Sequence, residues 1–149
     1  MASLDGANVH AIGPGEPIGY LEMIAGVPHV LTIETDAGQQ TRRLLFDGSQ
    51  PPGARSLQGY SVAQWESGSL KAITTNMTGG WLRKNGVPYS GEHTELTEYV
   101  DRLHGVFGED WLVFTTVVRD PLYLTREFNT STHFKKISDE TGWNPVPCG

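Results

Sequence analysis

Residues 95 to 118 read ELTEYVDRLHGVFGEDWLVFTTVV, and this stretch decides the fold. Two extended runs, 95–103 and 111–118, are joined across the turn signals of 105–110. The second run is apolar on both alternating faces and rich in Val, Thr and aromatic residues, which is typical of a central strand covered on both sides. The first run also fits a short helix, but its threonines and its partner run favour a strand. The stretch therefore predicts two paired strands at the centre of a sheet.

The rest of the chain alternates strand-like runs with turn signals in the same way. Asn85-Gly86 is the strongest short hairpin signal, and 47–48 and 66–69 mark two further turns. The runs with strand character are 18–24, 30–35, 41–46, 60–65, 70–75, 81–89 (as a hairpin), 95–103, 111–118 and 128–137. We therefore expect an all-β fold, either an antiparallel up-and-down barrel or a strongly curled sheet of about eight strands, because both forms reduce exposed edges. Residues 1–17 would form an irregular lead-in, 18–137 the barrel domain and 138–149 a C-terminal tail.

Composition limits the classes of function. The 149 residues suit one domain with a core of useful size, and 38% hydrophobic residues with 18 Gly and 9 Pro suit many short strands and turns. A net charge of −6 with scattered basic pairs argues against nucleic acid as a partner. Neither a signal peptide nor an apolar run close to the roughly 20 residues of a membrane span is visible. We expect a cytoplasmic protein without a membrane partner, and a homo-oligomer stays open.

Several segments, in order, carry a family resemblance. They are Thr41 to Gly48 (TRRLLFDG), Tyr60 to Leu70 (YSVAQWESGSL), Trp81 to Ser90 (WLRKNGVPYS), Thr97 to Tyr99 (TEY), Asp120 to Thr125 (DPLYLT) and Ser131 to Lys136 (STHFKK). Together they resemble a large, largely uncharacterised family of bacterial β-rich proteins with W-E-G-D-T-L, W-L-x-x-x-G-x-P-[HY]-S and D-P-x-x-[YF] motifs. The resemblance covers about residues 17 to 137 and implies a lipocalin-like barrel, without implying any established reaction.

The chain departs from that family pattern in three places. Tyr89 stands where many members have histidine, so no role of that histidine is carried over. The W-E-G-D turn is Trp65-Glu66-Ser67-Gly68 here, a change that a hairpin tolerates. Members of the family are often exported with an extra N-terminal segment, which this sequence lacks.

Glu98 is the first candidate for chemistry. On an extended strand Leu96, Glu98 and Val100 point to one face, so a carboxylate lies between two apolar side chains. If that face lines the interior, the carboxyl group suits a general acid or base. The alternatives are a solvated carboxylate on an outer patch and a structural pair with an arginine.

Two histidines are candidate partners of Glu98. His93 and Glu95 lie two residues apart and so share one face of an extended segment, which fits two metal ligands or, better, an exposed polar loop. His133 alternates with Thr132 and Phe134, so it points either into the interior, toward Glu98, or outward beside Lys135.

Five further side chains are candidates for contacting a bound molecule: Tyr89, Tyr123, Trp65, Trp81 and Thr116. Phenols and threonines offer hydrogen bonds, whereas tryptophans at such positions are more often core. No phosphate loop or nucleophile elbow occurs, and the single cysteine, Cys148, excludes a Cys-rich zinc site, so we expect neither cofactor nor metal.

These residues lead to three hypotheses. The first is a cofactor-independent enzyme (an isomerase, cyclase, lyase or hydratase) that transfers protons on a small apolar or aromatic molecule, with Glu98 as acid or base and His133 or His93 as its partner. The second is a non-catalytic carrier or sensor of such a molecule, in which the carboxylate and histidines face solvent or are locked in structural pairs. The third is a protein-interaction module with a filled interior and surface tryptophans.

Overall fold

The computed structural model describes residues 9–12, 30–36, 39–46, 52–82, 86–137, 145 and 147. These residues form strands and no helix, and so contain no helix of the length and apolarity that crossing a membrane requires. The strands are β1 (Val9–Ile12), β2 (Val30–Thr35), β3 (Gln40–Leu45), β4 (Tyr60–Glu66), β5 (Ser69–Thr75), β6 (Gly80–Trp81), β7 (Pro88–Tyr89), β8 (Glu95–His104), β9 (Asp110–Arg119) and β10 (Phe128–Lys135).

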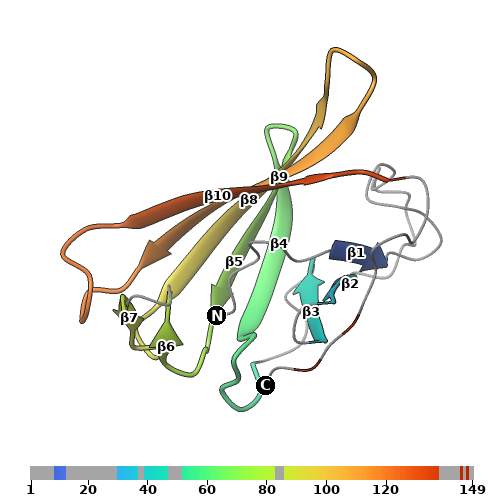
Figure 1. Cartoon of the computed structure of the whole chain (residues 1–149). Helices are drawn as coiled ribbons and strands as arrows, with labels where there is room; N and C mark the ends of the chain where they lie inside the picture. Colours follow the sequence, from blue (N-terminus) through green and yellow to red (C-terminus); the bar gives the residue numbers. More distant parts are fainter. Residues whose placement is uncertain are drawn as a thin grey trace.

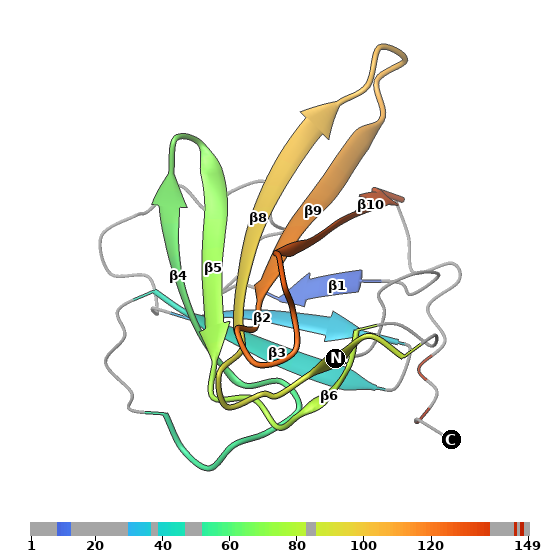
Figure 2. The same ribbon diagram turned by 90° about the vertical axis from the view of Figure 1, so that its left-hand side faces the viewer.

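One strongly curled sheet dominates the described part of the chain (Figure 1). Its order is β1-β2-β3-β4-β5-β8-β9-β10, and β6 pairs with β7 in a separate small hairpin. Figure 2 shows β2 and β3 running across the direction of β4, β5 and β8, so the sheet bends round a concave face. The prediction of an all-β, strongly curled sheet is confirmed, and the arrangement is consistent with a lipocalin-like fold. Within the described residues β1 and β10 do not pair, so the sheet stays open.

The pairing of β3 with β4 departs from a simple up-and-down order. All other neighbours in the large sheet are antiparallel, whereas β3 and β4 run parallel with Leu44 beside Ser61 and Leu45 beside Val62. A parallel neighbour needs a connection longer than a hairpin turn. Residues 46–59, between the two strands, supply that length.

Three further predictions need correction or limits. Val9–Ile12, inside the predicted irregular lead-in, forms β1 and pairs antiparallel with β2, whose edge it covers. The last strand ends at Lys135 instead of residue 137. The predicted run 18–24 lies outside the described residues.

The central pair β8–β9 is extended, so the helical alternative for 96–103 does not hold. β8 pairs over its length with β9 and also with β5, which fixes it in the sheet. The prediction that β9 is covered on both faces is confirmed for its inner face and only in part for its outer face. Phe114, Thr116 and Val118 are buried, whereas the residues between them are only half-buried. The outer face of β9 is therefore only partly covered, and both apolar clusters of the core lie on the concave face.

The core on the concave face falls into two apolar clusters. The first consists of Leu31, Ile33, Leu44, Ala63, Leu70, Ala72, Val100 and Phe114. The second consists of Met77, Tyr89, Leu96 and Val118. Leu96 and Val100 flank Glu98 on β8, and Phe114 and Val118 flank Thr116 on β9, so these polar residues lie between the clusters.

Candidate functional site

A layer of polar side chains crosses the concave face between the two apolar clusters. We call Arg42, Ser61, Thr74, Glu98 and Thr116 the polar layer. Strand alternation puts each of them on the inward side of its strand, and all except Arg42 are buried. Glu98 is the member whose burial is energetically most costly, because it is a carboxylate with only 2% of its surface exposed.

Arg42 reaches Glu98 from β3. Its Nη2 atom forms an ion pair with Glu98 Oε2 and donates hydrogen bonds to Thr74 Oγ1, at 2.7 Å, and Ser61 Oγ, at 3.4 Å. The two hydroxyl groups are themselves hydrogen-bonded at 2.7 Å. Ala72, directly opposite Glu98 on β5, carries only a methyl group and so leaves the space beside the carboxylate to the guanidinium. A structural pair with an arginine was one of the alternatives for Glu98.

The second oxygen of Glu98 has no such partner. Oε1 is buried and finds no hydrogen-bond donor in the part of the chain that the structure describes. About nine in ten buried polar groups in proteins have at least one partner, and over the described residues only this atom and Thr78 Oγ1 are buried side-chain atoms without one. Thr116 stands opposite Glu98 on β9, and Thr130 follows in register on β10, which extends the row of small polar side chains. The layer therefore presents a buried acceptor that the described side chains do not use.

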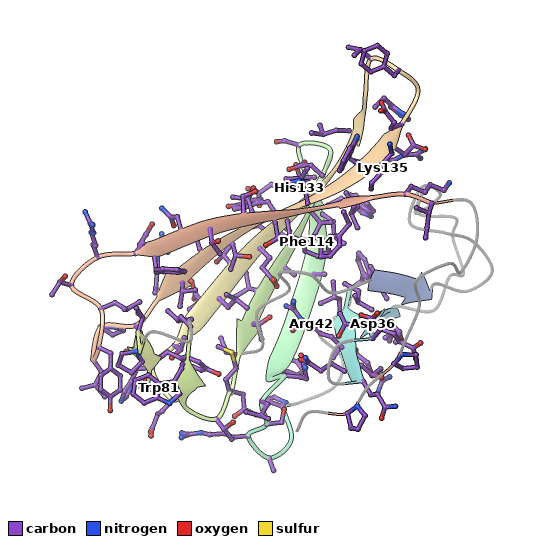
Figure 3. The ribbon with its side chains drawn as sticks, viewed as in Figure 1. Asp36, Arg42, Trp81, Phe114, His133 and Lys135 are labelled. Atoms are coloured by element: carbon purple, nitrogen blue, oxygen red, sulfur yellow. The ribbon has the colours of Figure 1, made fainter. Side chains whose placement is uncertain are left out.

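The two histidines do not join the polar layer. His133 is exposed on the outer side of β10, where its ring lies 5.5 Å from the ring of Trp111, and the Lys135 ammonium stands 5.7 Å from that same ring. Figure 3 shows His133 and Lys135 above β10 and Arg42 and Phe114 below it. Of the two orientations considered, His133 adopts the outward one, so the structure does not bring it together with Glu98.

His93 also lies apart from Glu98. It is exposed in the turn before β8, where its backbone N–H donates to Ser90 Oγ at 3.0 Å. Glu95, its neighbour in the His-x-Glu pair, has a half-exposed side chain near Arg119. Over the described residues, no three His, Cys, Asp or Glu side chains gather as a metal site would require.

The other five predicted contact residues divide by exposure. Thr116 belongs to the polar layer, and Tyr89 is buried in the second apolar cluster, where burial raises the pKa of its phenol. Trp81 and Tyr123 are largely exposed, and Trp65, inward-facing near the end of β4, is partly exposed. The structure thus places two of the five in the core of the concave side.

Asp120 is a second buried carboxylate, but its partners are complete. Both the Thr94 hydroxyl, at 2.7 Å, and the Ser90 N–H donate to Oδ2, while the N–H groups of Leu122 and Tyr123 donate to Oδ1 at 2.9 and 3.1 Å. Burial alone would raise the pKa of Asp120, but these hydrogen bonds outweigh it and lower the pKa to about 2. Asp120 connects the loop before β8 to the turn after β9 through these hydrogen bonds, so its role is structural.

Two members of the polar layer, Arg42 and Ser61, are not among the residues that the sequence predicts for the site. A signal was present, because Arg42 alternates with Leu44 and so occupies an inward position of a predicted strand. Comparison with protein-family models, with curated proteins and with solved structures finds no match for this chain. The family resemblance of the sequence therefore stays a prediction.

Proposed function

We propose that this protein binds a small, partly apolar molecule on the concave face of its sheet, as a carrier or sensor that does not convert it. The observation that supports the proposal is the unequal hydrogen bonding of the two carboxylate oxygens of Glu98. One of its oxygens is held by Arg42, and the other is buried without a donor in the described residues. Leaving a buried acceptor unsatisfied costs stability, and such local costs concentrate at functional sites.

The surroundings of Glu98 suit such a ligand. Small-molecule sites are lined mainly by apolar side chains with a few placed polar groups. The polar layer supplies hydroxyl groups and an ion pair, and an apolar cluster adjoins it on each side. The carrier hypothesis also expects the carboxylate to be locked in a pair and the histidines to face solvent, which is the arrangement described above.

Proton-transfer catalysis is the second candidate, favoured by the same Glu98 oxygen, which is able to take a proton from a bound molecule. It has less support, because a proton transfer also needs a group that returns the proton. Arginine does not normally give up its proton in proteins, and His93 and His133 are exposed away from Glu98. Binding is therefore the better-supported function.

A titration of intrinsic tryptophan fluorescence with a panel of small apolar and aromatic molecules tests the proposal. Wild type is compared with Glu98→Gln and with Glu95→Gln, a matched control on the outer face of the same strand. We expect wild type and Glu95→Gln to bind the same molecule equally and Glu98→Gln to bind it more weakly, with no product detected by chromatography. Product from wild type alone would favour the enzyme, and no binding by any molecule would reject the proposal.

A further inference from the structure

The charge of the polar layer restricts the ligand that it accepts. Arg42 and Glu98 carry opposite charges in direct contact, and the remaining members, Ser61, Thr74 and Thr116, are neutral hydroxyl residues. The layer is therefore neutral as it stands. A ligand with a formal charge would add an uncompensated charge between two apolar clusters, which is strongly unfavourable.

The hydrogen bonds restrict the ligand further. Arg42 Nη2 already serves Glu98, Thr74 and Ser61, whereas Glu98 Oε1 is an acceptor without a donor in the described chain. An acceptor calls for a ligand that donates. A carboxylate ligand has no proton to give and would be repelled, and an ammonium ligand would donate but bring a positive charge.

We infer that the ligand is a neutral hydroxyl compound, an alcohol or a phenol, whose O–H group donates to Glu98 Oε1. This inference rests on the proposed binding function. The remainder of the ligand is apolar, because Leu96 and Val100 stand on either side of Glu98 along β8, one in each apolar cluster. A hydroxyl group that donates to a carboxylate forms a charge-assisted hydrogen bond, which is stronger than one between neutral groups.

Four probes with one carbon skeleton test the inference by isothermal titration calorimetry at pH 7. They are 4-butylbenzyl alcohol, the cationic 4-butylbenzylamine, the anionic 4-butylbenzoate and 1-butyl-4-methylbenzene, which lacks a polar group. We expect the alcohol to bind wild type at least about tenfold more tightly than each of the other three. Tightest binding of the amine or the benzoate, or equal binding of alcohol and hydrocarbon, would overturn the inference while leaving the binding function in place. Absence of binding by all four would count against both.

A variant without the acceptor sharpens the test. Arg42→Met with Glu98→Leu replaces the ion pair by apolar side chains, a change that buried pairs often tolerate. Its preference for the alcohol over the hydrocarbon should disappear, whereas Glu95→Gln should keep the wild-type preference. If the double variant still preferred the alcohol to the hydrocarbon, Glu98 would not be the group that binds the ligand hydroxyl. The ranking of the four probes on wild type decides the question even if the double variant fails to fold.

Discussion

At the scale of single residues, the ion pair of Arg42 with Glu98 makes the sharpest prediction. Arg42→Met leaves a carboxylate, 2% exposed, without its cation, and breaking a buried pair from one side typically costs about 3–5 kcal/mol. Arg43→Met changes the adjacent, exposed arginine and should alter the free energy of unfolding by no more than about 0.5 kcal/mol. Urea unfolding followed by fluorescence measures both. Equal stability of the two variants would mean that the pair is not buried in solution.

Asp120 predicts a pH dependence at the same scale. Its pKa is about 2 in the folded chain and about 3.9 in an unfolded one, so folding favours the ionised form. The resulting stabilisation, roughly 2 kcal/mol, is complete above about pH 5 and is lost as the pH falls through 4 toward 2. In Asp120→Asn this part of the acid destabilisation should be missing. Parallel stability curves for wild type and variant between pH 5 and 2 would contradict the assignment.

The same residues show what sequence can and cannot give at this scale. The inward position of Glu98 follows from its alternation with Leu96 and Val100, which needs only the two-residue period of a strand. Its partner does not follow, because Arg42 lies 56 positions earlier and meets Glu98 only through the curl of the sheet. The orientation of His133 was undecided for a similar reason. Which of its two faces is inward depends on which neighbours β10 acquires.

At the scale of elements, the sequence predicts where most strands lie, but it predicts only some of the pairings between strands. The runs 30–35, 60–65 and 111–118 match β2, β4 and β9 closely, since alternation and turn residues are local signals. The parallel contact of β3 with β4 and the addition of β1 are tertiary choices. Both pairings depend on which strand edges are exposed once the rest of the sheet has formed.

The tip of the β8–β9 hairpin gives a prediction for one turn. Gly108 has φ of +86° and its N–H donates to the Gly105 carbonyl at 3.1 Å, so the backbone there favours glycine. A Cβ at Gly108 or at Gly53 would meet no atom within 4 Å, and Gly53 lacks the positive φ. Gly108→Ala should therefore lower the free energy of unfolding by about 1 kcal/mol, and Gly53→Ala should leave it unchanged or slightly raise it. Equal urea midpoints for the two variants would show that the positive φ at position 108 does not require glycine.

Two apolar residues at this tip are almost fully exposed. Val106 and Phe107 are 93% and 88% exposed, at the two corner positions where turns usually carry polar residues. Figures 1 and 2 show the hairpin reaching beyond the strands beside it. Changing both to serine should alter the free energy of unfolding by less than about 1 kcal/mol, as urea unfolding would measure. A larger loss would mean that the pair packs against the chain.

At the scale of the whole molecule, the polar layer separates two apolar clusters that would otherwise join. A layer on which the stability of the fold depends should be costly to replace, whereas a layer on which it does not depend should be replaceable at no cost in stability. Buried ion pairs exchanged for apolar residues of similar volume often leave a protein equally stable or more stable by about 1–4 kcal/mol. Replacing Arg42 and Glu98 together therefore tests whether the stability of the fold depends on the polar layer.

Arg42→Met with Glu98→Leu applies this contrast to the whole fold. We expect the double variant to unfold in urea at the same or a higher concentration than wild type, because no buried charge is left unpaired and the two clusters become continuous. We also expect 4-butylbenzyl alcohol to raise the Tm of wild type and to raise that of the double variant less, since a ligand stabilises the state that binds it. A double variant less stable than wild type by several kcal/mol would instead mark the layer as structural. Equal Tm increases in both proteins would show that the alcohol binds without the layer.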